Sequence, residues 1–478
     1  MAATPMTRPW TLRIPAPMMR TLRGHLFPGD HDEHGAVIGA AVVPTPRGTR
    51  LLARRLFLAV DGVDYVPGQR GYRMLTASFV RECALKCADE GLAYLAIHCH
   101  GGERTVSFSS DDLASHERGY PALLDILAGP PVGGVVFARN AVAGDIWIGG
   151  GRRFSLECTD VVGRVQVRSF PHPTPVPTGI AEEWDRQVRL FGDAGQALLS
   201  QLKVGVVGAG GAGSLVNEYL SRLGVGHLVV VDPERLDPTN LPRVVGALLK
   251  DVRPWLTHRR MPGFIRSIGL RRRSSKVSIA RRVALAASPD IIFEGVRGDI
   301  SDASVLAHLI DCDFVFLAAD TMQARLVTNA LVHQYLIPGI QVGAKVDVDR
   351  ETGQVHDVFS AVRHLVPGES CLWCNQLINP ARLAEEATNP EQLRRQRYID
   401  EISAPSVITL NAVAAALAVN DFLFAVTGLA TDVELRWRKF HPLTDSVVSE
   451  VPRRDANCSE CAGRLGAGPL LRMPVRGN

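Results

Sequence analysis

The chain has 478 residues, too many for one hydrophobic core, so two or three domains are expected. With 46% hydrophobic and 21% charged residues its composition is that of a soluble globular protein, and the net charge of +4 is too small for general attraction to nucleic acid or membranes. No apolar run is long enough to span a membrane, and residues 1–9 lack the apolar core of a secretory signal, so we expect a cytoplasmic protein.

The first chemical motif follows a strand predicted over residues 93–97. His98 and His100 come directly after it, and side chains two residues apart in a strand lie on the same face. Ser109 is expected to be the N-cap of a helix, which places Asp112 in the first turn. Two imidazoles and one carboxylate can therefore converge on one cation, and three protein ligands are typical of a catalytic zinc with a fourth position open for water.

Glu33 lies far upstream and is the candidate general base for that water, while Ser109 would donate a hydrogen bond to the developing oxyanion. This H-x-H-x8-S-x2-D pattern resembles the JAB/JAMM metalloisopeptidases, which cleave the bond after the C-terminus of a ubiquitin-like protein. The resemblance covers roughly residues 12–150 and implies an α+β metallopeptidase domain with a helix near residues 75–88. It departs from the family at Gly101, where proline is usual, and in the spacing after Glu33. A lone His-x-His pair is more often packing, but the full set of spaced positions favours a metal.

A proline-rich stretch at residues 171–177 marks a boundary. Alternating prolines cannot join a sheet interior and favour extended geometry, so residues 151–180 are predicted to be a semi-rigid linker. After it, strands alternate with helices, which is typical of a doubly wound parallel α/β sheet. Residues 463–478 are expected to form a loosely ordered tail.

The second domain opens with a phosphate-binding pattern. A strand predicted over residues 203–207 leads into a glycine-rich turn and then a helix, and Asp232 ends the next strand, where it is suited to ribose hydroxyls. Taken alone, this pattern suits a nicotinamide or flavin enzyme equally well. The glycines of the turn are Gly208, Gly210, Gly211 and Gly213.

Four further segments narrow the choice. Together they look like the ThiF-type adenylyltransferases, the fold shared by ubiquitin-activating enzymes and the activators of thiamine and molybdopterin sulfur carriers. The resemblance spans roughly residues 181–462, although the family's Asn-Leu-Asn-Arg reads Asn-Leu-Pro-Arg here. The segments are residues 185–192, 240–243, 320–325 and 404–408.

This resemblance implies that a C-terminal glycine carboxylate attacks the α-phosphate of ATP and that pyrophosphate leaves. It further implies a homodimer, because in relatives the first arginine comes from the partner subunit. Residues 251–275 look like an insertion relative to the family, which makes Lys250 a rival of Lys276. The roles carried over are Arg243 and Lys276 at the phosphates, Asn240 beside them, Asp320 as a ligand of Mg²⁺, and Arg186 at the γ-phosphate of the other subunit.

The insertion itself is rich in arginine and carries Trp255 and Phe264. It could be read as a nucleic-acid patch. We favour instead an exposed flap or a docking surface for an acidic protein partner. The sequence alone does not decide between these interpretations.

Two cysteine pairs predict a second metal. Cys371-Leu-Trp-Cys374 and Cys458-Ser-Glu-Cys461 have the spacing of a closed structural zinc, which leaves no position for substrate, and many ThiF-type enzymes carry the same pairing. Two unrelated redox pairs are the weaker alternative. No cysteine occurs in residues 375–403, where thioester-forming relatives have one. The remaining cysteines are expected to be packed thiols: Cys83, Cys87, Cys99, Cys158 and Cys312.

The sequence therefore predicts a bifunctional bacterial enzyme that adenylates a ubiquitin-like or sulfur-carrier protein ending in Gly-Gly and also trims or releases that carrier. ATP, Mg²⁺, one catalytic Zn²⁺ and one structural Zn²⁺ are the expected cofactors. A separate conjugating or sulfur-donating protein would receive the activated carboxylate, with neither nucleic acid nor membrane as a partner. The alternatives are a sulfur-transfer system for cysteine or cofactor synthesis, an NAD-dependent oxidoreductase, and an inactive scaffold.

Overall fold

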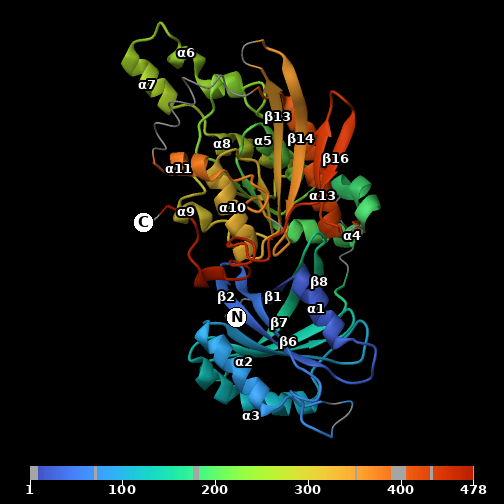
Figure 1. Cartoon of the computed structure of the whole chain (residues 1–478). Helices are drawn as coiled ribbons and strands as arrows, with labels where there is room; N and C mark the ends of the chain where they lie inside the picture. The colour runs from blue at the N-terminus through green and yellow to red at the C-terminus, as the bar shows by residue number, and fades with distance from the viewer. Residues whose placement is uncertain are drawn as a thin grey trace, which may run out of the picture. The chain divides into compact units, whose positions relative to one another are not determined.

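The computed structural model describes residues 9–68, 71, 73–175, 182–349, 352–369, 371–388, 405–430 and 434–476. The chain divides into two compact units (Figure 1). Unit 1 comprises Met1–Val176, His333–Leu336 and Gly463–Arg472, and unit 2 comprises Pro177–Val332, Ile337–Ala462 and Met473–Asn478.

Unit 1 is built on an eight-stranded sheet in the order β1-β3-β2-β4-β5-β6-β7-β8. β1 pairs in parallel with β3 and also with β7, so the sheet closes on itself in a barrel-like form. This closure leaves β1 without a free edge. The strands are β1 (Trp10–Pro15), β2 (Gly35–Thr45), β3 (Gly48–Leu58), β4 (Ala93–Cys99), β5 (Val132–Phe137), β6 (Val142–Ile148), β7 (Arg152–Val162) and β8 (Val167–Ser169).

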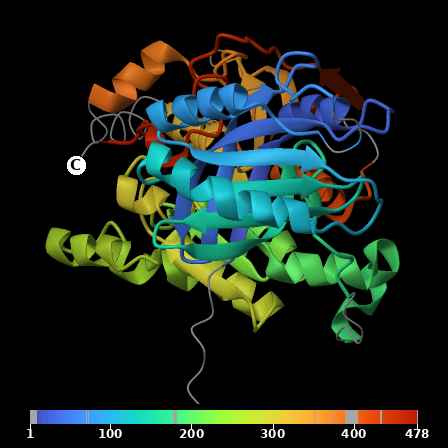
Figure 2. The same cartoon turned by 90° about the horizontal axis from the view of Figure 1, so that it is seen from below.

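Three helices cover this sheet. α1 (Ala16–Leu26) packs against β1, β3 and β7 and buries Met19, Leu22 and Leu26 among the apolar side chains of the strands. α2 (Ala77–Asp89) and α3 (Ser110–Leu127) pack together against β4 and β5, and Figure 2 shows both helices lying across one face of the sheet. The helix expected near residues 75–88 is therefore present as α2.

The limits of unit 1 differ from the sequence prediction at two places. β7 and β8 belong to the sheet, so the connecting segment starts after Ser169 rather than at residue 151. The predicted loose tail is also partly packed: residues 463–472 belong to unit 1, where Arg54 donates to the Leu465 carbonyl oxygen at 3.0 Å. Both differences arise from pairings between residues far apart in the chain, which local patterns do not show.

Unit 2 is an α/β structure on a second eight-stranded sheet, in the order β11-β10-β9-β12-β13-β14-β15-β16. The first five strands in this order are parallel, and the last three form an antiparallel extension. The strands are β9 (Lys203–Val207), β10 (His227–Val231), β11 (Ile292–Val296), β12 (Phe314–Leu317), β13 (Gly339–Val348), β14 (Val355–Leu365), β15 (Trp437–His441) and β16 (Ser446–Glu450).

α13 (Ile408–Thr427) forms the centre of the unit 2 core. It packs against α5, β13 and β14, and its Phe422 ring lies 4.9 Å from the ring of Phe314. From the sequence we expected no apolar run of membrane-spanning length, but α13 is, among the described residues, the one helix long and apolar enough to cross a membrane. Half of that stretch (50%) is buried, as expected of a core helix. The other helices are α4 (Asp185–Gln201), α5 (Gly211–Arg222), α6 (Pro254–Thr257), α7 (Gly263–Arg271), α8 (Lys276–Ala287), α9 (Ala303–Leu306), α10 (Met322–Gln334) and α11 (Pro380–Thr388).

Candidate functional site

The structure brings His98, His100 and Asp112 together in unit 1. His98 lies on β4, His100 directly follows that strand, and Asp112 is in the first turn of α3. The two Nε2 atoms are 3.2 Å apart, and carboxylate oxygens of Asp112 lie 3.4 Å from His98 Nε2 and 3.3 Å from His100 Nε2. Ligand atoms at the corners of a tetrahedron around zinc are about 3.3 Å apart, because each bond is about 2.0 Å long. The three side chains therefore fit a zinc ion with an open fourth position.

Hydrogen bonds behind this cluster fix its side chains. His100 Nδ1 lies 3.1 Å from the Ser107 carbonyl oxygen, so a proton on Nδ1 leaves the Nε2 lone pair facing the cluster. Asp112 Oδ2 accepts from the backbone N–H and the hydroxyl of Ser109 at 2.8 and 2.7 Å. Burial opposes ionisation of Asp112, but hydrogen bonds from His100 and His98 outweigh it and hold the pKa of Asp112 well below its ordinary value. The capping box of α3 thus also positions a candidate metal ligand.

Glu33 lies just before β2 and beside this cluster. Its Oε1 atom is 3.7 Å from His100 Nε2, and its backbone N–H donates to the Gly71 carbonyl oxygen at 2.8 Å. Partial burial raises the pKa of Glu33. The positive charges of His100 and His98 reduce this rise without cancelling it. A half-buried carboxylate with a raised pKa is chemically suited to act as a general base. Ser109 donates its hydroxyl proton to Asp112, so it must leave that bond before it can donate to an oxyanion.

In unit 2, the glycine-rich turn connects β9 to α5 through two positions where only glycine fits. Gly208 has a φ of 93°, and a Cβ there would lie 2.9 Å from the backbone nitrogen of Ala319. A Cβ on Gly213 would lie 1.7 Å from the Gly208 carbonyl oxygen. These close approaches bring the start of α5 beside the loop that follows β12. Gly210 is the N-cap of α5 and offers no side-chain cap, so the first amides of the helix are available to a phosphate.

The turn lies where the strand order reverses. β9 is flanked by β10 and β12, and the chain leaves β9 towards β10 and only later returns to β12. Open α/β sheets bind nucleotides at the carboxyl ends of the strands at such a reversal. The glycine-rich turn follows β9, and the exposed Asp320 follows β12. The two loops that the sequence assigned to phosphate and Mg²⁺ are thus adjacent.

Asp232 and Lys276 form a buried group beside this turn. The two carboxylate oxygens of Asp232 accept from the N–H groups of Ala209 and Glu234, each at 2.8 Å. Lys276, the first residue of α8, donates to Glu234 at 2.5 Å and lies 4.0 Å from Asp232. Burial raises the pKa of Asp232, although the ammonium group of Lys276 opposes this shift. Asp232 is suited to accept ribose hydroxyls, whereas Lys276 must leave Glu234 to reach a phosphate.

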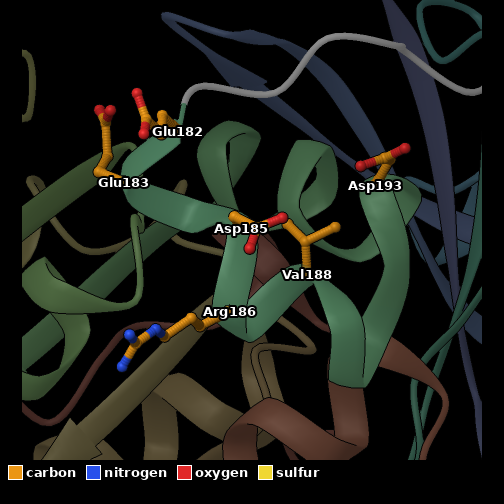
Figure 3. A pocket seen from close by; sticks show the side chains of 6 residues that line it. All are labelled: Glu182, Glu183, Asp185, Arg186, Val188 and Asp193. Atoms are coloured by element: carbon orange, nitrogen blue, oxygen red, sulfur yellow. The ribbon is translucent and has the colours of Figure 1, made fainter.

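The other predicted nucleotide residues differ in their surroundings. Asn240 is buried at the end of a short helix, η2 (Pro238–Asn240), and the backbone of Arg243 approaches the glycine turn, with its carbonyl oxygen 3.7 Å from where a Cβ on Gly211 would lie. Arg186 is exposed on α4 and lines an open hollow of ≈ 570 Å³ (Figure 3). Four carboxylates and Val188 line the same hollow, so its net charge is negative. The carboxylates belong to Glu182, Glu183, Asp185 and Asp193.

Four cysteines form the second metal-type cluster. The sulfur atoms of Cys371 and Cys374 are 3.3 Å apart, those of Cys371 and Cys458 3.8 Å, and those of Cys374 and Cys461 3.6 Å. Tetrahedral thiolates around zinc are about 3.8 Å apart, because each Zn–S bond is about 2.3 Å long. The set therefore fits a closed structural zinc.

Two buried asparagines that the sequence analysis did not single out support these sites. Asn329 on α10 accepts the N–H of Leu372, between two of the cysteines, at 2.9 Å. Asn411 on α13 lies against the glycine turn, because a Cβ on Gly211 would be 2.4 Å from its Nδ2 atom. In the sequence, both asparagines could have been noticed as polar residues within apolar stretches predicted to be helical. Of the predicted motif at residues 404–408, Ala404 lies outside the described residues.

A family model described as the ThiF family matches residues 184–461, more than half of the chain. The chain belongs to the ThiF family. The matched residues contain the glycine turn, the Asp232–Lys276 group and the four cysteines. The α/β fold of unit 2 is therefore that of a ThiF-family domain.

Curated proteins with similar sequences include two activating enzymes and one adenylyltransferase. The chain is 27% identical over 183 residues to the SAMP-activating enzyme E1 of Haloferax volcanii, covering 38% of this chain and 56% of that protein. It is 28% identical over 193 residues to the molybdopterin-synthase adenylyltransferase of Escherichia coli, covering 40% and 66%. It is 24% identical over 233 residues to the ubiquitin-like modifier-activating enzyme 5 of Rattus norvegicus, covering 46% and 48%. The chain thus spans about half to two thirds of these relatives.

Among solved structures, E. coli MccB with ATP is similar with a TM-score of 0.43 and 19% sequence identity, covering 60% of this chain and 76% of that chain.

Proposed function

We propose that unit 2 adenylates the C-terminal glycine of a ubiquitin-like or sulfur-carrier protein, and that unit 1 is a JAMM-type metallopeptidase acting on the same carrier. The first activity rests on one observation: the uncapped start of α5, Asp232 and the loop of Asp320 meet where the strand order reverses. The names of the relatives support the substrate class, because they include a SAMP-activating enzyme and a molybdopterin-synthase adenylyltransferase.

In the proposed reaction, a carboxylate oxygen of the carrier forms a bond to the α-phosphorus of ATP. The bond from that phosphorus to the β-bridging oxygen breaks, and pyrophosphate leaves with the electron pair. The amides of α5 and the guanidinium of Arg243 stabilise the negative charge, Lys276 joins them, and Asn240 orients the phosphates. Asp320 would hold Mg²⁺, which when bound supplies further positive charge to the phosphate oxygens. Arg186 of the partner subunit completes the site, so the active form is a homodimer.

Exchange of labelled pyrophosphate into ATP tests this reaction. The parent chain with Gly-Gly-ended ubiquitin-like proteins should support exchange, and Asp320→Ala should lower the rate by about 10²-fold or more, as removal of a charge-stabilising group does. His98→Ala is the matched control and should retain the parent rate. Absence of exchange together with nicotinamide binding would instead identify a redox enzyme.

The activated carboxylate is transferred to a separate conjugating or sulfur-donating protein. This proposal rests on the absence of cysteine from residues 375–403 of the sequence. A stable thioester on the purified chain after addition of ATP and carrier would contradict it. Sulfide-dependent product formation would distinguish sulfur transfer from protein tagging.

The second activity rests on the triangle of His98, His100 and Asp112, whose edges suit tetrahedral zinc. Zinc bound there supplies a water of lowered pKa. As the water oxygen bonds to the carbonyl carbon, Glu33 would take the water proton, and it would pass that proton to the amine when the carbon–nitrogen bond breaks. Ser109 would donate to the oxyanion after leaving Asp112. Carrier fusions extended beyond Gly-Gly are the substrates for the test. Glu33→Gln should abolish cleavage while the protein keeps its zinc, and cleavage by that variant would refute the role of Glu33.

A further inference from the structure

A basic helical hairpin leaves unit 2 between two parts of the nucleotide site. Residues 252–273, which we call the arm, contain α6 and α7. The arm begins nine residues after Arg243 and ends three residues before Lys276. Both of its ends are therefore joined by short segments to residues proposed to contact the phosphates.

The arm is a preformed element. At its base, the buried carboxylate of Asp251 accepts from the Ser274 hydroxyl at 2.8 Å and from Arg282 at 2.7 Å. The Asp251 carbonyl oxygen accepts the Ser274 N–H at 3.0 Å, which closes the two ends together. Within the arm, a Cβ on Gly269 would lie 2.6 Å from Leu256 Cβ, so this glycine lets α6 and α7 touch. The outer side chains are thus held in a defined arrangement.

The surface of the arm combines positive charge with exposed aromatic side chains. Residues 252–289 contain no aspartate or glutamate. Trp255 and Phe264 are 61% and 69% exposed. Exposed aromatics beside arginines are typical of protein–protein interfaces, and they indicate an acidic, partly apolar partner surface. The exposed arginines are Arg259, Arg260, Arg266, Arg271 and Arg272.

A surface of this kind exists on the same unit. The hollow around Arg186 is lined by the carboxylates of Glu182, Glu183, Asp185 and Asp193 (Figure 3). Leu190 on α4 adds an apolar side chain that is 58% exposed. The hollow therefore complements the arm in both charge and polarity.

The arm does not cover the hollow of its own chain. In Figures 1 and 2 the arm and α4 lie at opposite ends of unit 2. Two copies related by a two-fold axis can make two such contacts at once, one with each arm.

We propose that the arm of one copy docks on the acidic hollow of a second copy, and that this contact carries Arg186 of the partner subunit to the phosphates. The inference rests on the proposed adenylation reaction, which needs an arginine from the partner. The arm is joined in sequence to Arg243 and Lys276, and Arg186 lines the hollow, so one docking event would bring the two halves of the site together.

Charge reversal on each surface tests the contact. Arg259→Glu/Arg260→Glu and Glu182→Arg/Glu183→Arg should each raise the dimer dissociation constant about tenfold or more in sedimentation experiments, and less at high salt. A chain carrying all four changes should dimerise like the parent. Pyrophosphate exchange by the two reversed variants should fall at low protein concentration and recover at high concentration. Arg118→Glu/Arg152→Glu, on exposed positions of unit 1, is the matched control and should change neither property.

A second variant, Trp255→Ser/Phe264→Ser, removes the apolar contact without changing charge and should also weaken the dimer. The inference is overturned when the reversed variants dimerise like the parent, or when the four changes together fail to restore dimerisation. It is also overturned when reversal on the arm leaves the dimer intact and instead weakens binding of the intact carrier, of RNA or of anionic vesicles. A charge-responsive dimer without exchange activity would support the docking and refute the adenylation reaction, so the two failures are distinguishable.

Discussion

At the scale of single residues, the absence of a methyl group at Gly213 allows α5 to start against β9. A Cβ there would lie 1.7 Å from a backbone oxygen that cannot move without displacing the turn. We expect Gly213→Ala to destabilise the protein by about 3 kcal/mol, as overpacking against rigid backbone does. Thermal unfolding measures this change.

The matched control for that substitution lies in the same turn. Gly210 has ordinary φ and no neighbouring atom within 4 Å of an added Cβ, and serine is a favourable N-cap. The free energy of unfolding of Gly210→Ser should therefore lie within about 0.5 kcal/mol of the parent value. Equal destabilisation by both substitutions would show that the turn does not pack as described.

The titration of Asp232 predicts a pH dependence of nucleotide binding. Burial raises its pKa, so the carboxylate is protonated at a higher pH than an ordinary aspartate and then loses an acceptor for the ribose. ATP affinity should fall as the pH is lowered through the raised pKa of Asp232, measured by calorimetry, and Asp232→Asn should bind weakly without this dependence. The effect on folding has the opposite sign: a raised folded-state pKa contributes stability at low pH that is lost as the pH rises through that pKa. A parent affinity independent of pH would contradict the prediction.

Single residues also show the limit of sequence reasoning. Ser109 was predicted as an N-cap from its neighbours alone, and the structure confirms it. The contact of Asn411 with the glycine turn joins residues 200 positions apart, from 211 to 411, so no local pattern could reveal it. Lys276 was assigned from a motif, but its bond to Glu234 depends on the packing of α8 against the sheet.

At the scale of elements, the first turn of α3 connects helix stability with metal binding. Ser109 caps the helix and also bonds the Asp112 carboxylate through its hydroxyl and its N–H. Ser109→Ala should therefore lower stability by about 1 kcal/mol and weaken zinc binding by about 10- to 100-fold. Ser109→Thr keeps the hydroxyl and should restore both properties. Zinc competition with a chelator and thermal unfolding measure the two effects, and a loss of stability without loss of zinc affinity would separate the cap from the metal site.

Elements defined by neighbouring residues were predictable, and elements defined by distant pairing were not. The strand, glycine turn and helix from β9 to α5 follow from consecutive residues, and the expected strand coincides with β9. β7 and β8 fall within the predicted linker, although β7 pairs with β1, about 145 residues earlier in the chain, and β8 pairs in turn with β7. The packing of α6 on α7 likewise depends on the fit between Gly269 and Leu256.

At the scale of the whole molecule, each unit carries its own metal-type cluster. We expect two zinc ions per chain by elemental analysis, one held by three ligands and one by four thiolates. His98→Ala should remove one equivalent and leave pyrophosphate exchange unchanged, whereas Cys371→Ser should remove the other and destabilise unit 2. A single zinc per parent chain would contradict one of the two assignments.

The hydrogen bonds between Asp251 and Ser274 at the base of the arm have a consequence for how related chains can differ. Because these bonds hold the two ends of the arm together, its length and charge can change without moving the phosphate-binding groups of the same chain, while the contact with a second copy changes. Two chains that catalyse the same reaction but carry arms of different length or charge would each dimerise with their own copies and not with one another.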